Sequence, residues 1–158
     1  MNTLTVGDKA PLFTLNNQDN NPVTLSELQG KKVLIYFYPR ASTPGCTVQA
    51  QGLRDTKAEL DAHNVIVLGI SPDTPKKLTN FINKQELNFT LLADEDHATC
   101  EAYNVWQLKK FMGKESMGVV RTSFLIDENG NLEHIFKGEN EFIDFRGKIS
   151  NYELPEPV

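Results

Sequence analysis

The sequence of 158 residues contains only two cysteines, Cys46 and Cys100. A chain of this length buries roughly 70% of the surface that its unfolded state exposes, so it needs no disulfide bonds to hold a core. Clustered metal ligands are also missing, because the two cysteines lie far apart and the three histidines are scattered. We therefore expect no metal site and no cofactor. Both cysteines are instead candidates for catalysis, redox sensing or simple burial.

Positive charge and long apolar runs are scarce as well. The chain has 16 Lys and Arg against 21 Asp and Glu, a net charge of −5, and it has no basic block, which argues against nucleic-acid binding. No stretch approaches the apolar length of a membrane span, and the first thirty residues lack the pattern of a secretory signal. We expect a cytoplasmic protein without a membrane partner. Thiols stay reduced in that compartment.

Gly and Pro separate short periodic segments, with no internal repeat or linker, which predicts one domain over residues 1–158. Strand and helix patterns alternate and end in a hairpin. This order predicts an α/β fold in which a mixed central sheet has helices on both faces and an N-terminal β-hairpin. The expected elements are a hairpin over 13–25, strands over 32–38, 65–70, 89–92 and 119–126, a final strand over 132–136, and helices over 43–63, 75–83 and 96–103. A helix over 141–149 is weakly indicated, and we expect the tail from about residue 150 to be frayed.

Cys46 follows a buried strand at the start of a predicted helix. Thr43 suits the N-cap and Pro44 the first helical position, which places Cys46 inside the first turn. Unpaired backbone N–H groups and the positive end of the helix dipole favour a thiolate there. The N–H groups of Gly45 and Cys46 could also bind a small polar substrate. The alternative is a small buried core residue, and Thr43 could serve only as a helix cap.

The run Thr43-Pro44-Gly45-Cys46 stands where thioredoxins carry a C-x-x-C motif at the same strand-to-helix junction. Thr43 replaces the first cysteine of that motif, so no local disulfide can form. A single thiolate beside a hydroxyl suits attack on a small electrophile better than dithiol exchange.

The chain resembles the peroxiredoxins. Pro39-x-x-x-Thr43-x-x-Cys46 matches their active-site motif, and the flanking sequence is similar to the peroxiredoxin Q, or bacterioferritin comigratory protein, branch from about Leu4 to Phe136. The matching flanks are Tyr36-Phe37-Tyr38-Pro39, the segment from Asn88 to Asp94, and Arg121-Thr122-Ser123-Phe124.

This resemblance implies a thioredoxin-like fold and a thiol peroxidase that reduces hydrogen peroxide and organic hydroperoxides in antioxidant defence. It implies that Cys46 is the peroxidatic cysteine, oxidised to sulfenic acid, and that Thr43 holds the thiolate and the peroxide. Pro39 would shield the sulfur from water, and Arg121 would stabilise the thiolate and orient the peroxide. Without the resemblance, Arg121 reads as a solvated strand residue. Gln49 could support the site or be an exposed helix residue.

Many members of this branch carry a resolving cysteine five residues after the peroxidatic one, where this chain has Gln51. Three routes remain for reducing the sulfenic acid. An external thiol such as thioredoxin, or glutaredoxin with glutathione, could reduce it directly, which we favour. Cys100 could act as a remote resolving cysteine if its Cα came within about 7 Å of that of Cys46. Two chains could also pair, although we expect a monomer.

Two other functions fit a reactive Cys46. A redox-sensing module would consume about one equivalent of peroxide and then stop. A monothiol disulfide reductase would act on a protein or glutathione disulfide and hardly on a hydroperoxide.

Overall fold

The structure is a computed structural model, and it describes residues 4–40, 50, 51, 54, 58, 61, 62, 64–111 and 113–137. The predicted helix over 141–149 and the expected frayed tail lie outside these residues, as does most of the predicted helix over 43–63. Residues 50, 51, 54, 58, 61 and 62 are helical, in agreement with that last prediction.

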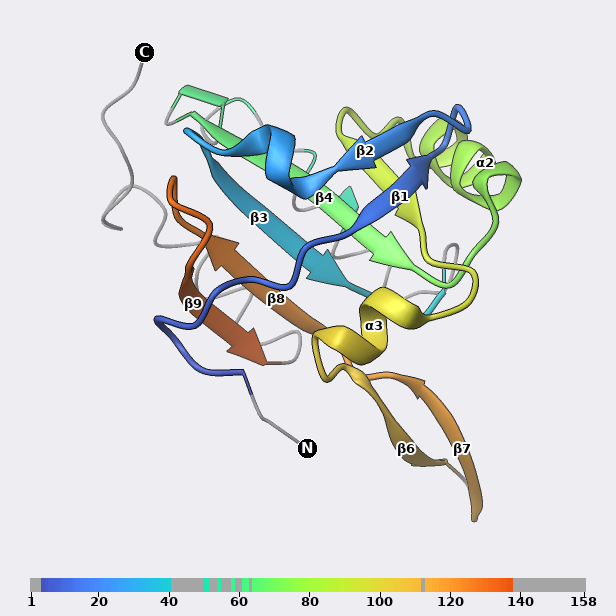
Figure 1. The fold of residues 1–158 in the computed structure, drawn as a ribbon. Coiled ribbons are helices and arrows are strands. Elements are labelled where there is room, and N and C mark those ends of the chain that lie inside the picture. Colours follow the sequence, from blue (N-terminus) through green and yellow to red (C-terminus); the bar gives the residue numbers. More distant parts are fainter. Residues whose placement is uncertain are drawn as a thin grey trace.

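A seven-stranded mixed sheet forms the centre of the fold (Figure 1), in the order β2-β1-β5-β4-β3-β8-β9. β3 pairs in parallel with β4, and β4 with β5, whereas the other neighbours pair antiparallel. This confirms the expected mixed sheet. The strands are β1 (Thr14–Asn17), β2 (Pro22–Thr24), β3 (Lys32–Phe37), β4 (Val65–Ser71), β5 (Thr90–Ala93), β8 (Thr122–Ile126) and β9 (Leu132–Lys137).

The central strand β3 is buried along its whole length. Side chains alternate between the two faces of a strand, so β3 contributes to two separate cores. One core, which we call the α2-side core, contains Leu34, Tyr36 and Tyr38. The other, the α3-side core, contains Val33, Ile35 and Phe37.

Described helices lie on both faces of the sheet. Helix α2 (Pro75–Gln85) begins at the cap residue Thr74, whose Oγ1 accepts a hydrogen bond from the backbone N–H of Lys77, and its Leu78 and Phe81 lie in the α2-side core. Helix α3 (Ala98–Ala102) places Cys100 in the α3-side core. Helices on both faces were predicted from the sequence.

A glycine in β4 makes room for an aromatic ring. Gly69 pairs with Tyr36 of β3, and a Cβ at position 69 would lie 2.7 Å from both the Tyr36 ring and the Leu91 side chain. The ring of Tyr36 also stacks on that of Tyr38, with centroids 5.1 Å apart. Position 69 therefore accepts no side chain without movement of the α2-side core.

A second, two-stranded sheet was not predicted. β6 (Trp106–Phe111) and β7 (Lys114–Val119) pair antiparallel around a tight turn at Gly113, which has a φ of +80°. The hairpin projects away from the central sheet (Figure 1). The prediction of one strand over 119–126 is therefore wrong at its start. β7 belongs to the hairpin, whose pairing continues one residue past Val119, where Val120 donates its N–H to the Val105 carbonyl at 2.7 Å. β8 begins only at Thr122.

Candidate active site

The predicted reactive segment starts where β3 ends. Pro39 and Arg40 are the last described residues before it, and Thr43, Gly45, Cys46 and Gln49 lie outside the described residues. The described residues that bear on the predicted site are therefore those that precede it, follow it or pair with β3.

Arg121 lies beside the end of β3. β3 and β8 pair antiparallel, and the last pair in register joins Phe37 to Thr122. Arg121 directly precedes Thr122, and Pro39 follows Phe37 by two residues. The register therefore brings the two chain segments that carry these predicted site residues to the same end of the strand pair, from positions far apart in the sequence.

Ala50 connects the helix after Cys46 to the same face of the sheet. Its side chain is fully buried in the α2-side core together with Tyr36 and Tyr38. Leu125 of β8 belongs to the same core. Ala50 and Leu125 therefore lie on one side of β3.

Gln51 occupies the position at which a local resolving cysteine would stand. Its Nε2 donates a hydrogen bond of 2.9 Å to Oε1 of Gln85, at the end of α2. One turn further along, the Arg54 guanidinium donates to the Gln85 carbonyl at 2.7 Å. The amide at position 51 has a structural role that a thiol could not fill in the same way.

A large cleft opens next to Pro39. Its volume is about 720 Å³, and it lies between the start of α2 and the β6–β7 hairpin. The residues that line it include Pro39, Arg40, Pro72, Asp73, Lys77, Trp106, Lys109, Lys110 and Met117. A cleft of this size accommodates a small-molecule ligand.

Cys100 has a very different environment. Its side chain is fully buried, and its backbone N–H donates a hydrogen bond of 2.7 Å to the carboxylate of Asp94, which is itself buried. Burial, with a further contribution from the Asp94 carboxylate, raises the pKa of the Cys100 thiol far above its ordinary value. A thiol in this state is a poor nucleophile, since the thiolate is the reactive form.

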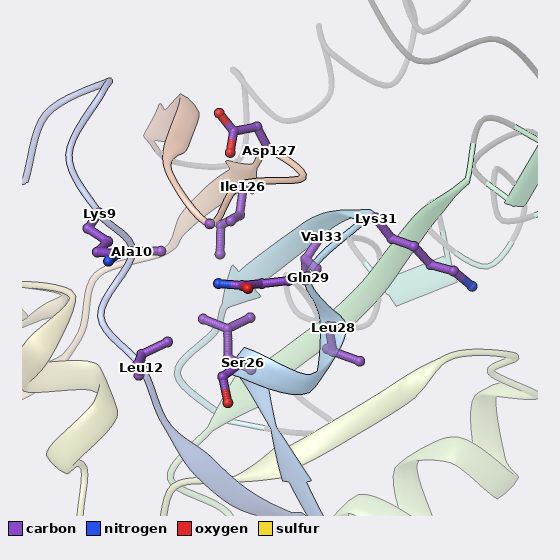
Figure 2. Close-up of a pocket in the computed structure, with 12 residues that line it drawn as sticks. Lys9, Ala10, Leu12, Ser26, Leu28, Gln29, Lys31, Val33, Ile126 and Asp127 are labelled. Atoms are coloured by element: carbon purple, nitrogen blue, oxygen red, sulfur yellow. The ribbon is translucent and has the colours of Figure 1, made fainter.

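A second pocket lies at the opposite end of the β3–β8 pair (Figure 2). It is surrounded by the N-terminal segment, by residues that lead into β3, and by the end of β8; Leu12, Leu28, Val33 and Ile126 are among them. Its volume is about 20 Å³, little more than one water molecule needs. This pocket is too small for a substrate.

Among the described residues, no cluster of His, Cys, Asp and Glu could hold a metal ion, and no described helix is long and apolar enough to span a membrane.

The wall of the cleft that the β6–β7 hairpin forms was not predicted from the sequence. The alternation of Trp106, Gln107 and Leu108 before Gly113 was the available signal for it.

The chain was compared with known proteins. Residues 6–135 match the AhpC/TSA family. The chain is 57% identical over 136 residues to Peroxiredoxin Bcp of Escherichia coli, which covers 86% of this chain and 87% of the relative. A structure of Xanthomonas campestris Peroxiredoxin Q shares 29% identity with a TM-score of 0.81 and covers 89% of this chain and 90% of that one. Another structure from this organism concerns the alkyl peroxide reduction activity of its bacterioferritin comigratory protein, with 29% identity, a TM-score of 0.80, and coverage of 88% and 90%.

Proposed function

The chain belongs to the AhpC/TSA family and is a peroxiredoxin, a thiol-dependent peroxidase with a thioredoxin-like fold; we propose that it works through a sulfenic acid at Cys46, which an external thiol reduces. The observation that supports this assignment of the site is the register of β3 and β8, which brings Arg121, the residue before Thr122, to the end of β3 that leads into Pro39. A fixed positive charge at this point favours a thiolate on the segment that follows.

In the proposed oxidation step, the Cys46 thiolate attacks the O–O bond of the hydroperoxide. A sulfur–oxygen bond forms, the O–O bond breaks, and the leaving alkoxide or hydroxide takes up a proton. Sulfur is oxidised by two electrons and the hydroperoxide is reduced to an alcohol or to water. Arg121 stabilises the negative charge on both the thiolate and the departing oxygen.

The other residues of the motif have positioning roles in this proposal. The Thr43 hydroxyl and the N–H groups of Gly45 and Cys46 hold the thiolate and the peroxide, and Pro39 excludes water from the sulfur. Gln49 supports the hydrogen bonds of the site. Pro39, the one member of this group within the described residues, is half-buried and lines the cleft.

The reductive half of the cycle needs a thiol from outside the chain. Gln51 stands where a local resolving cysteine would lie, and Cys100 is fully buried in a site that keeps its thiol protonated. We propose a one-cysteine cycle in a monomeric, single-domain protein, with thioredoxin, or glutaredoxin and glutathione, as reductant. Such thiols are kept reduced in the cytoplasm, where we place the protein.

Peroxide consumption with dithiothreitol as reductant tests the role of Cys46. Cys46→Ser should abolish turnover, whereas the matched variant Cys100→Ala should consume many equivalents of peroxide, as the wild type does. Intact mass after one equivalent of peroxide gives a second readout: a gain of one oxygen supports the one-cysteine cycle. A loss of two hydrogens would show that Cys46 and Cys100 meet, and turnover by Cys46→Ser would refute the assignment.

A further inference from the structure

We propose that the cleft beside Pro39 is the binding site for the reductant and that it takes a small anionic peptide thiol with the chemistry of glutathione. This inference rests on the proposed one-cysteine cycle, in which the reductant must reach the sulfenic acid from solution.

The charge of the cleft points to an anion. Four cationic residues line it, and Asp73 is the one carboxylate that does so among the described residues; the cations are Arg40, Lys77, Lys109 and Lys110. Asp73 is buried and accepts a hydrogen bond of 2.8 Å from the Ser71 hydroxyl. This positive cleft belongs to a chain whose net charge is −5. A local field of this sign attracts anions against the charge of the whole molecule.

Two of the lysines are placed to contact a ligand from opposite walls. Lys77 is exposed in the first turn of α2, where the helix dipole adds to its charge. Lys109 comes from the hairpin, and its Nζ is held by a hydrogen bond of 3.0 Å to the Val119 carbonyl. Lys110 is partly neutralised by an ion pair of 3.2 Å with Glu115. Carboxylates at the two ends of a short peptide match cations on two walls.

The size and aromatic wall of the cleft point to a small ligand. Its volume of about 720 Å³ suits a tripeptide better than a hydrogen peroxide molecule. Trp106 forms part of the wall, and its ring is fixed by stacking on His97, with the centroids 4.0 Å apart and the planes inclined by 3°. A rigid indole offers an apolar surface to a peptide backbone without loss of side-chain entropy.

The bound thiol would reduce the Cys46 sulfenic acid in two steps. Its sulfur attacks the sulfenic sulfur of Cys46, a mixed disulfide forms, and hydroxide leaves and takes up the thiol proton as water. A second thiol molecule then attacks the mixed disulfide, which releases the Cys46 thiol and an oxidised small-molecule disulfide.

Binding can be measured without any redox chemistry. Trp106 is the only tryptophan of the chain and lines the cleft, so tryptophan fluorescence reports on this site. Titration of Cys46→Ser protein with S-methylglutathione should give a saturable change with a Kd of about 1 mM or below. The dimethyl ester of the same probe should bind about tenfold more weakly. Equal binding of both probes, or no saturable change, would overturn the proposal whether or not Cys46 is peroxidatic.

Variants separate the cleft from general charge effects. In the Cys46→Ser background, Lys77→Gln combined with Lys109→Gln should raise the Kd of S-methylglutathione about tenfold, because each exposed ion pair contributes up to about 1 kcal/mol. The matched control is Lys84→Gln, which removes an exposed charge from the last turn of the same helix and should leave the Kd within about twofold. An equal effect of both changes would contradict a site in the cleft.

Kinetics with Cys46 intact test the reductant itself. The rate of sulfenic acid reduction by glutathione should fall about tenfold in the Lys77→Gln, Lys109→Gln protein, and the rate with the glutathione diester should fall much less. If the double change slows reduction by a protein dithiol such as thioredoxin but not by glutathione, the cleft serves a protein partner and the small-thiol proposal is wrong. If wild-type protein forms no sulfenic acid, the proposed function fails, while the fluorescence result still stands.

Discussion

At one end of the β3–β8 pair, β3 stops beside Arg121 and a cationic cleft of about 720 Å³ opens next to Pro39. At the other end, Lys32 begins β3 almost fully buried and ion-paired with Glu133, and the nearby pocket holds only about 20 Å³. The same two strands thus end in an open cleft lined by cations and in a closed pocket near a paired lysine. We expect changes at the first end to affect chemistry and changes at the second to affect stability.

The largest expected effect is at the open end. Arg121→Gln should lower the second-order rate constant of Cys46 oxidation by hydrogen peroxide about 100-fold, because it removes a charge that stabilises the thiolate and the leaving oxygen. Stopped-flow measurement of sulfenic acid formation checks this. Arg121→Lys, which keeps the charge, should recover part of the rate, and an unchanged rate in Arg121→Gln would remove Arg121 from the site.

A substitution at the closed end, where Lys32 begins β3, should change the stability of the protein and leave its activity unaltered. Lys32→Met breaks the ion pairs with Glu133 and Glu128 and leaves a partly buried carboxylate without its partner, which should lower the free energy of unfolding by about 2 kcal/mol. Urea denaturation measures this change. The oxidation rate of Cys46 should stay within about twofold of wild type, and a parallel loss of rate would show that the two ends are coupled.

Two buried groups of the α3-side core, Cys100 and Tyr103, extend the comparison to pH. Burial raises the pKa of both Cys100 and Tyr103 in the folded state, so above their ordinary values, about 8.5 and 10, the unfolded chain ionises while the folded chain does not. Stability is thus fully present below pH 8.5 and falls as pH rises beyond it, with a slope of up to about 1.4 kcal/mol per pH unit for each group. Cys100→Ala should flatten the part of the fall between about pH 9 and 10, as measured by unfolding at several pH values. An unaltered slope would contradict a buried, protonated thiol.

The smallest expected change in stability concerns Gln51. Gln51→Cys loses the hydrogen bond to Gln85 and should lower the unfolding free energy by about 1 kcal/mol. It also provides a thiol five residues after Cys46 in the sequence. Intact mass after peroxide should then show a loss of two hydrogens, where the wild type gains one oxygen. Gln51→Ser is the matched control, and retention of the added oxygen in Gln51→Cys would mean that the helix does not open for closure.

The sequence analysis predicted the central sheet because its signal is strong: the unbroken apolar run from Val33 to Tyr38 fits only a strand buried on both faces. The β6–β7 hairpin was missed since it packs little against the sheet, so lysines interrupt its apolar alternation. Because the hairpin was not predicted, the wall of the cleft that it forms was not predicted either. Which residues from α2 and the hairpin face one another depends on tertiary packing, and no local pattern contains that information. The roles of the site residues stay predictions, namely those of Pro39, Thr43, Gly45, Cys46, Gln49 and Arg121.

Gly69 has a consequence for the engineering of this fold. The ring of Tyr36 fills the space that a side chain at position 69 would need, and it stacks in turn on Tyr38, the residue before Pro39. Added bulk at position 69 would push this row of rings toward Pro39. Substitution of Gly69, which has no side chain, could therefore alter the reactivity of the predicted site while every polar group of that site is left in place.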